Sequence, residues 1–280
     1  MPVNTADPRF VQLSFANSSV TIFYFGATVT SWTVDGHERL FLSSKALLDS
    51  SKAIRGGIPL VFPHFGSVSY SKLPQHGFAR NSTWKFLGAV KDSSDEVVVQ
   101  FELRPELVPE HLRALWQHDF RLVYTVRLAD RTLTTSLRAE NPGSESFLFT
   151  SLLHTYLRIA NVDDVAVRGF ENRQYLDKVT PGTFTETRSE AKIAMEVDRV
   201  YQQVDGEVLV ENTHIGDVRI HKTNFPDVVL WNPWIEKAQA MADFGDEEYK
   251  NMVCVEVGSV STPIVLEAGQ SWEGQQILVV

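Results

Sequence analysis

Residues 120–143 read FRLVYTVRLADRTLTTSLRAENPG, which is two runs of alternating side chains closed by a turn. Apolar and polar residues alternate from Phe120 to Leu128 and again from Arg131 to Glu140. A period of two places every second side chain on the same face, as in a strand that buries one face. The run Asn141-Pro142-Gly143 then supplies a turn. This stretch therefore predicts neighbouring strands of an antiparallel sheet.

Short strand patterns of this kind recur along the chain. Val20 to Phe25 and Ala27 to Val34 are rich in β-branched and aromatic residues, and the pair Asp35-Gly36 after them is a strong hairpin signal. The pairs Pro181-Gly182, Asp205-Gly206 and Ala268-Gly269 mark other turns. The remaining strand patterns are Phe147 to Ile159, Val165 to Gly169, Val208 to Thr213, Val218 to Lys222, Val228 to Trp231, Val253 to Val257 and Gln275 to Val280.

Helical patterns are few and short. The best are Ser43 to Asp49 and Glu106 to Gln117, and strands and helices do not alternate, which disfavours a parallel doubly wound sheet. No Pro- or Ser-rich linker divides the chain. We therefore predict an all-β protein, a large antiparallel β-sandwich with a few short helices, formed by a single domain over residues 1–280.

Composition excludes several classes of function. A formal charge of −9 over 280 residues argues against nucleic acid or an anionic membrane as a partner. The single cysteine, Cys254, rules out an internal disulfide and any site of several thiolates. Residues 1–10 lack the apolar core of a signal peptide, and no run approaches the ~20 apolar residues of a membrane span. We expect a cytoplasmic monomer.

The most informative residues for function lie between Arg55 and Arg80. The chain reads RGGIPLVFP from Arg55 and LPQHGFAR up to Arg80, and its glycines and prolines indicate a shaped loop. This loop carries two guanidiniums, the amide of Gln75 and the imidazole of His76, a set that suits an anionic ligand rich in oxygen. An arginine taken at random is more often a surface residue, and only the setting of these two favours a site.

His154 and Glu256 are candidates for an acid and a base. In MVCVEV, strand alternation places Cys254 and Glu256 on one face and the valines on the other, so Glu256 is either a solvated edge residue or a carboxylate with a raised pKa. In SLLHTYL, His154 shares a face with Leu152 and Tyr156, a setting in which a satisfied core histidine is the more common case.

Metal and cofactor signals are weak. The eight histidines form no His-x-His or His-x-x-x-His cluster with a nearby carboxylate, and His111 and His118 resemble stray surface residues. No phosphate-binding P-loop, dinucleotide glycine fingerprint or Gly-x-Ser-x-Gly motif occurs. We therefore expect neither a metal nor a cofactor.

Five runs carry a family resemblance: RGGIPLVFP, LPQHGFAR, SLLHTYL, EVDRVYQ and WNPWIEKAQAMADFGDEEYKNMVCVEVG. They resemble the hexose-6-phosphate mutarotases (glucose-6-phosphate 1-epimerases) of the aldose-1-epimerase superfamily, in the family's order, from about Val20 to Leu278. The resemblance implies a galactose-mutarotase-like supersandwich with its pocket on a concave sheet face. It also implies an isomerase that interconverts the α and β anomers of a small-molecule hexose 6-phosphate without a cofactor.

The resemblance also implies roles for individual residues. His154 is the expected general acid and Glu256 the expected general base. The substrate-binding positions fall on Arg55, Gln75, Arg80 and Asp198, and His76 of the same loop faces the sugar. Without the resemblance, Asp198 and Arg199 look like a plain turn or strand-edge pair. We expect desolvation to raise the pKa of Glu256, and a nearby carboxylate to raise that of His154.

Two other functions remain open at this stage. An aldose 1-epimerase acting on free hexoses would bind a neutral sugar, for which amides and carboxylates are better suited than a pair of arginines. A non-catalytic sugar-phosphate-binding protein would not need both proton carriers. A glycoside hydrolase would use two carboxylates across the scissile bond, for which Asp198 and Glu256 are candidates, but His154 would then be idle.

Overall fold

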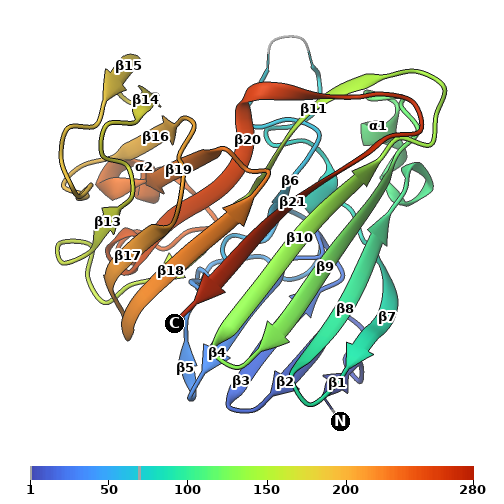
Figure 1. Ribbon diagram of the computed structural model, residues 1–280, viewed down its shortest axis with the longest axis horizontal. Coiled ribbons are helices and arrows are strands. Elements are labelled where there is room, and N and C mark those ends of the chain that lie inside the picture. The colour runs from blue at the N-terminus through green and yellow to red at the C-terminus, as the bar shows by residue number, and fades with distance from the viewer. Residues whose placement is uncertain (1, 69–70) are drawn as a thin grey trace.

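Strands arranged in three sheets dominate the computed structural model, which describes residues 2–68 and 71–280 (Figure 1). All pairings between the named strands are antiparallel, as the alternating patterns predict. The first sheet has the order β1-β2-β3-β4-β5, with strands β1 (Val3–Asn4), β2 (Phe10–Phe15), β3 (Ser18–Phe23), β4 (Val29–Val34) and β5 (His37–Glu38).

The other two sheets have eight strands each. One has the order β13-β17-β18-β21-β10-β9-β8-β7, with β13 (Ala166–Arg168), β17 (Val208–Thr213), β18 (Gly216–Thr223), β21 (Ser271–Val279), β10 (Thr132–Glu140), β9 (Arg121–Ala129), β8 (Glu96–Leu103) and β7 (Lys85–Asp92). The other has the order β15-β14-β16-β19-β20-β11-β6, plus β12 beside β20, with β15 (Gly182–Thr185), β14 (Gln174–Asp177), β16 (Val197–Tyr201), β19 (Asp227–Asn232), β20 (Met252–Leu266), β11 (Phe147–Leu153), β6 (Leu60–Val61) and β12 (Tyr156–Arg158).

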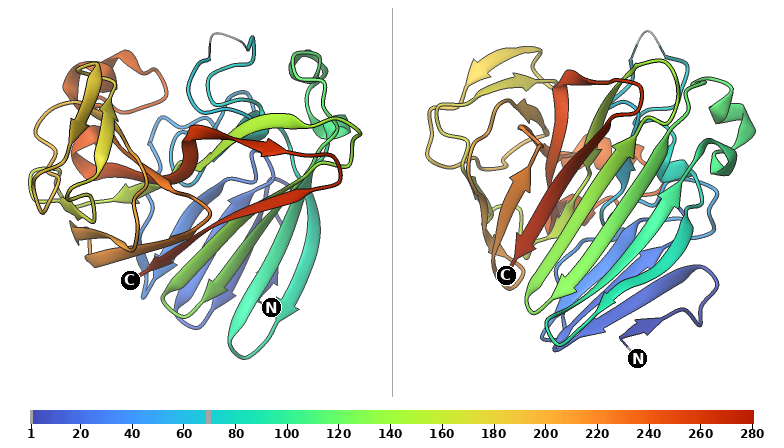
Figure 2. Two further views of the ribbon diagram at one scale, coloured as in Figure 1. Left: turned by 45° about the horizontal axis from the view of Figure 1, so that its top comes forward. Right: turned by 45° about the vertical axis from the view of Figure 1, so that its right-hand side comes forward.

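The five-stranded sheet packs face to face on one of the larger sheets. Strands β2 and β3 contact β8 and β9, and Figure 2 shows these layers side by side. The predicted all-β sandwich is therefore confirmed. The main hydrophobic cluster draws on all three sheets, through residues such as Leu13, Val99 and Val255. The single domain over residues 1–280 stays a prediction.

The strand predictions hold where side chains alternate. The runs from Phe120 and Arg131 form β9 and β10, and the predicted Asp35-Gly36 turn joins β4 to β5 with positive φ at both residues. Two predicted strands differ in length. Val253 to Val257 is the start of the longer β20, and the run from Phe147 to Ile159 is broken into β11 and β12.

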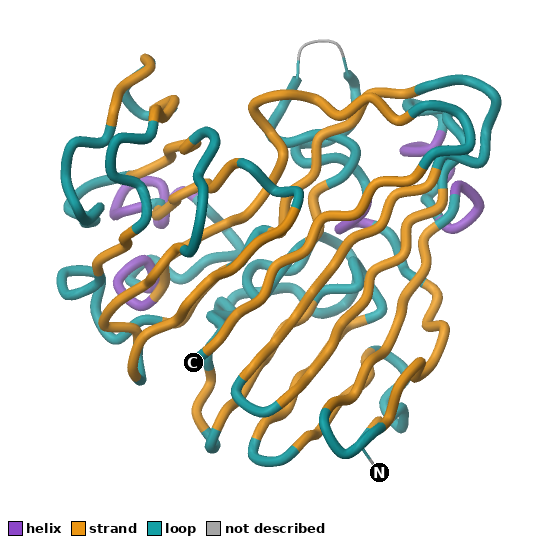
Figure 3. The backbone as a smooth tube through the Cα atoms, viewed as in Figure 1, coloured by secondary structure: helices purple, strands orange, loops and turns teal. Residues whose placement is uncertain are grey.

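The helix predictions are less accurate. Residues Ser43 to Asp49 form no helix, and at the start of this segment the carboxylate of Glu248 accepts hydrogen bonds from the Ser43 hydroxyl (2.6 Å) and the Ser44 amide (2.8 Å). The second prediction reduces to two short pieces, η2 (Pro105–Leu107) and α1 (Glu110–Arg113). The sequence prediction omits α2 (Trp234–Ala240) and the 3-10 turns η1 (Ala79–Asn81) and η3 (Glu248–Asn251). Figure 3 shows how small the helical part is, and no helix within the described chain is long and apolar enough to cross a membrane.

Strand β20 separates the hydrophobic core from the functional side of the molecule. In its first half it lies between β19 and the pair β11 and β12. Val253, Val255 and Val257 enter the main core, whereas Met252 and Cys254 join a second cluster on the opposite face. The predicted alternation is therefore confirmed.

Gly57→Ala tests the close backbone packing that anchors the arginine loop. An added Cβ at Gly57 would lie 2.0 Å from the Val29 carbonyl oxygen, and its φ is +67°. We expect the free energy of unfolding to fall by more than about 3 kcal/mol, since the clash involves backbone that cannot move aside.

Gly36→Ala is the matched control. Gly36 has φ +78° and nothing within 4 Å of the added Cβ, so only the conformational strain of about 1 kcal/mol remains. Urea unfolding measures the free energy of unfolding of both variants. Equal losses of this free energy would show that the close backbone approach at Gly57 is unimportant.

Candidate active site

A cavity of about 270 Å³ opens on the face of β20 that bears Glu256. All the site residues expected from the sequence line this cavity, although they come from a loop, a strand break and two strands far apart in the chain. They are Arg55, Gln75, His76, Arg80, His154, Asp198 and Glu256.

Glu256 is held in the interior of its sheet. It is 1% exposed and lies opposite Val229 of β19 in the strand register, so the alternative of a solvated edge residue is wrong. Burial raises the pKa of the Glu256 carboxyl well above 4.5, and the nearby Asp198 carboxylate adds to the shift. This direction agrees with the expectation from the sequence.

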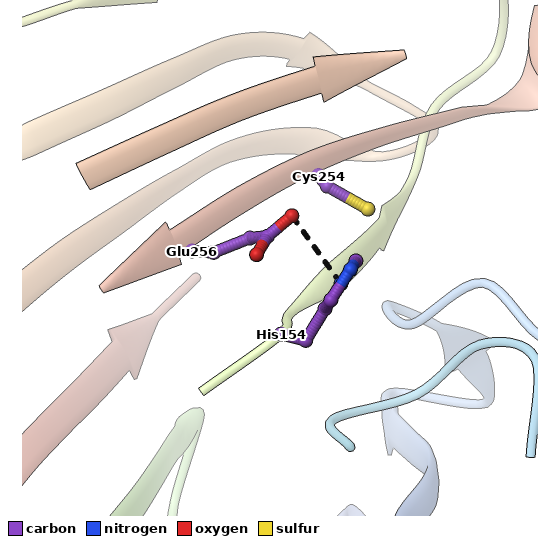
Figure 4. Close-up of side chains that lie close together, drawn as sticks. All are labelled: His154, Cys254 and Glu256. Atoms are coloured by element: carbon purple, nitrogen blue, oxygen red, sulfur yellow. Dashed lines mark ion pairs between the residues drawn. The ribbon is translucent and has the colours of Figure 1, made fainter. Parts of the chain in front are cut away.

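His154 lies at the break between β11 and β12. Its backbone amide donates to the Pro59 carbonyl at 3.0 Å, and its ring stacks on Tyr156 with centroids 4.7 Å apart. The Nδ1 atom of His154 lies 3.3 Å from Oε1 of Glu256, and Figure 4 shows the two side chains pointing toward one another. The ring is buried as a core histidine would be, yet it lines the cavity beside a carboxylate.

The expected upward shift of the His154 pKa is wrong. Burial holds the pKa of His154 well below 6.5, and the Arg80 and Arg55 guanidiniums lower it further. Desolvation and two cations therefore outweigh the neighbouring carboxylate. With the pKa of Glu256 raised, both groups are driven toward their neutral forms in the empty cavity.

The two arginines have different surroundings. Arg55 donates to both carboxylate oxygens of Asp243 at 3.3 Å and to the hydroxyl of Tyr156 at 3.3 Å. Arg80 donates to the Gln75 carbonyl at 2.9 Å, and among residues 2–68 and 71–280 no carboxylate lies within ion-pair distance of it. Burial lowers the pKa of Arg80 to about 10, so it remains a cation at neutral pH. Arg80 is thus a partly buried positive charge that has no acidic partner among the described residues.

His76 is oriented by the backbone around it. It has φ +68°, its amide donates to the Gly66 carbonyl at 2.9 Å, and its Nδ1 accepts from the Gly66 amide at 3.1 Å. The neutral ring must then carry its proton on Nε2. The ring meets that of His154 edge-on at 5.7 Å, while burial and the Arg80 charge hold the pKa of His76 well below 6.5.

Asp198 belongs to strand β16, so the sequence reading of a plain turn or strand-edge pair is wrong. In the sheet, β16 lies between β14 and β19. The Asp198 carboxylate lies 3.7 Å from the Lys178 ammonium, and burial raises its pKa. No alternation signal reveals this strand, because its half-buried Asp198 and Arg199 interrupt the apolar pattern.

Several lining residues are not predicted from the sequence. Lys178 lies just past β14 with its ammonium 3.9 Å from the centroid of the Phe65 ring, and Lys237 projects from α2. Trp231, the end of a predicted strand, also lines the cavity, with its ring 6.1 Å from that of His154. No local pattern marks these residues, because their positions depend on how separate strands meet.

One group of metal-ligating side chains occurs in the described part of the chain. Ligand atoms of His154, Cys254 and Glu256 lie within 4.8 Å of one another, and all three residues are buried. Histidine and cysteine positions along the sequence do not reveal this group, since the thiol lies on β20 and the imidazole lies at the break before β12, 100 residues apart in the chain (Figure 4).

Comparisons with known proteins define the class of protein. A family model described as aldose 1-epimerase matches residues 9–278. The chain belongs to the aldose 1-epimerase family and is an isomerase.

The similar proteins are more specific. A protein of Cenchrus ciliaris named "Putative glucose-6-phosphate 1-epimerase" is 39% identical over 92% of this chain and 80% of its own length. One of Escherichia coli (strain K12) with the same name is 33% identical over 84% of this chain and 78% of its own length. A solved structure from Salmonella typhimurium, described as a "putative mutarotase", superposes with a TM-score of 0.88 at 27% identity, covering 100% of this chain and 96% of the other.

Arg80→Gln tests the electrostatic account of His154. We expect His154 in the wild-type protein to titrate below pH 6.5, because burial and the arginines oppose its charged form. Removing the Arg80 charge removes one of these causes, so the pKa should rise toward 6.5. Nitrogen NMR of the imidazole across a pH series measures both values.

Arg131→Gln is the control for this titration. Arg131 is exposed and pairs with Asp35 at 2.6 Å, away from the cavity. Its loss should leave the His154 pKa unchanged, and the electrostatic account fails if the Arg80 variant also leaves it unchanged.

Proposed function

We propose that this protein is a hexose-6-phosphate mutarotase, which interconverts the α and β anomers of glucose 6-phosphate and related sugars. One observation carries the proposal. The cavity joins a close imidazole–carboxylate pair, 3.3 Å apart, to an arginine that has no carboxylate partner among the described residues. The His154–Glu256 pair suits the proton transfers of ring opening, and the Arg80 guanidinium suits a phosphate. The names of the similar proteins support the same substrate.

Ring opening needs two proton transfers at the anomeric centre. In the proposed mechanism, Glu256 takes the proton of the C1 hydroxyl while His154 donates a proton to the ring oxygen. The C1–O5 bond breaks, the aldehyde rotates about C1–C2, and the ring closes on the other face with the two roles reversed. Each positioned group of this kind is typically worth about 10²–10⁴ in rate. No redox change or group transfer occurs, so the residues of the cavity suffice.

The phosphate helps to prepare the acid. Arg80 and Arg55 hold the His154 pKa down in the empty cavity. A bound phosphate dianion offsets their positive charge, so the imidazolium becomes easier to form at the moment the sugar arrives. Because the imidazole and carboxylate interact closely, their titration belongs to the pair and not to either residue alone.

The remaining polar residues are proposed to hold the sugar ring. Gln75 and Asp198 offer an amide and a carboxylate to the hydroxyls, and His76 offers its Nε2 proton, since its Nδ1 is occupied by the Gly66 amide. Arg55 and Arg80 bind the phosphate, where forked guanidiniums match pairs of oxygens better than an ammonium does. We further propose a cytoplasmic monomer without nucleic-acid or membrane partners, which the formal charge of −9 supports.

Exchange rates of several sugars test the substrate class. We expect NMR exchange spectroscopy or polarimetry to show faster anomer exchange for glucose 6-phosphate than for free glucose, with galactose and mannose 6-phosphates compared alongside. Equal acceleration of free glucose would favour an aldose 1-epimerase for free hexoses. Binding of glucose 6-phosphate without any acceleration would favour a non-catalytic sugar-phosphate-binding protein.

Glu256→Gln tests the base. We expect kcat for glucose 6-phosphate to fall by about 10²–10⁴, because the amide cannot accept the C1 hydroxyl proton. Glu207→Gln is a matched control, since the partly buried Glu207 lies outside the cavity and 3.3 Å from Nε2 of the exposed His221, the same nitrogen–oxygen distance as in the cavity. Polarimetry measures both variants, and near-normal activity of the Glu256 variant would remove Glu256 from the mechanism.

Arg80→Ala tests the phosphate site. We expect KM for glucose 6-phosphate to rise by about tenfold or more, because a charge-assisted contact to phosphate is lost. The slow rate on free glucose should change little, since that sugar has no phosphate to bind. Equal losses of activity on glucose 6-phosphate and glucose would show that Arg80 contacts the sugar ring or stabilises the fold. Arg131→Ala is the control for the loss of a surface arginine.

A further inference from the structure

The proposed mechanism leaves Cys254 without a role, although its thiol lies beside both proton carriers. Cys254 is fully buried on the cavity face of β20 and is the only cysteine in the chain. Its sulfur, a nitrogen of His154 and an oxygen of Glu256 all lie within 4.8 Å of one another (Figure 4). Nitrogen, sulfur and oxygen donors of this kind are the ligands that zinc prefers.

The spacing of two of these donors already fits a metal ion. Zinc binds imidazole nitrogen and carboxylate oxygen at about 2.05 Å in a tetrahedron, which places such a pair roughly 3.3 Å apart. Nδ1 of His154 and Oε1 of Glu256 lie 3.3 Å apart. The thiol lies within 4.8 Å of both atoms, and it would have to approach to the roughly 3.5 Å of a zinc-bound sulfur when the metal binds.

Two polar atoms of this group also lack a hydrogen-bond partner among the described residues. They are Nδ1 of His154 and Oε2 of Glu256, and both atoms are buried. Buried polar atoms are normally satisfied, so unpaired ones mark a place prepared for a ligand. The sugar is one such ligand, and a small cation that enters through the same cavity is another.

We propose that His154, Cys254 and Glu256 form a binding site for Zn²⁺ or a similar thiophilic divalent cation, and that metal binding reversibly inhibits the enzyme. Three protein ligands leave the fourth tetrahedral position open toward the cavity. A bound metal occupies both proposed proton carriers, so it competes with the sugar. The inhibitory part of the inference rests on the proposed function, whereas the binding part does not.

The charges around the site limit its strength and set its selectivity. Arg55, Arg80 and Lys178 repel a cation, whereas Asp198 attracts one. The affinity should therefore fall well below that of structural zinc sites, which reach about 10–16 kcal/mol. Mg²⁺ and Ca²⁺ need six or more oxygen ligands, which one carboxylate does not supply. Inhibition should accordingly follow the thiophilic metals.

The first test measures inhibition. We expect Zn²⁺ in a chelator-free buffer to stop the anomer exchange of glucose 6-phosphate, EDTA to restore it, and equal concentrations of Mg²⁺ to have no effect. Cys254→Ser and Cys254→Ala should keep the metal-free rate and raise the half-inhibiting Zn²⁺ concentration by about tenfold or more, since one ligand is lost. His221→Asn is the matched control, because the exposed His221 and the partly buried Glu207 form a pair at the same 3.3 Å without a thiol. Inhibition that the Cys254 variants leave unchanged, or that His221→Asn relieves, overturns the proposal.

The second test needs no activity. Co²⁺ bound to a thiolate gives a sulfur-to-metal charge-transfer band in the near ultraviolet, so we expect this band in the wild-type protein and its loss in both Cys254 variants. If the wild-type protein does not show this band, the proposed metal site is refuted, even if a variant fails to fold. A protein that shows the band but does not accelerate anomer exchange keeps the metal site and refutes the proposed function.

Discussion

The structure depends on the alternation of strand β20, whose two faces meet opposite environments. Val253, Val255 and Val257 pack into the main core, whereas Glu256 lines the cavity and Cys254 is buried in a second cluster on the same face of the strand. Strands β19, β11 and β12 pair along both edges, so the strand cannot slip by one residue without moving the carboxylate into the core and the valines into the cavity. The same pairing that secures the core therefore fixes a buried carboxylate at the floor of the site.

The site holds polar groups in an unfavourable state. Glu256 is desolvated, Arg80 has no acidic partner among the described residues, and burial drives His154 toward its neutral form. Folding alone would favour pairing or removing such groups. In the proposed function, an anionic sugar would relieve several of these costs at once, because its phosphate would meet the arginine and its hydroxyls would meet the unpaired oxygen and nitrogen. Local rules of stability are commonly broken in this way at functional sites.

Contacts between distant segments hold the reactive side chains in place. Asp243, which follows α2, holds Arg55 from one side, while the Tyr156 hydroxyl accepts from it on the other. The turn after His154 is fixed by Thr155, whose hydroxyl donates to the buried Gln276 of β21 at 2.9 Å. The eight-stranded sheet that contains β21 therefore supports the imidazole without lining the cavity. Such supporting contacts decide whether a proton carrier sits within reach of its substrate.

The sequence by itself determined the features that depend on neighbouring residues. Alternation gave β9, β10 and the two faces around Glu256, and the RGG and QHGFAR runs identified the arginine loop. Only the tertiary structure decided that residues 43–49 are not a helix, that Asp198 lies within a sheet, that Lys178 borders the cavity and that the pKa of His154 is lowered. The physical reason is the range of the forces involved. Periodicity and turn preference act between adjacent residues, whereas desolvation, charge pairing and the capture of backbone amides by Glu248 depend on segments that meet only in the folded chain.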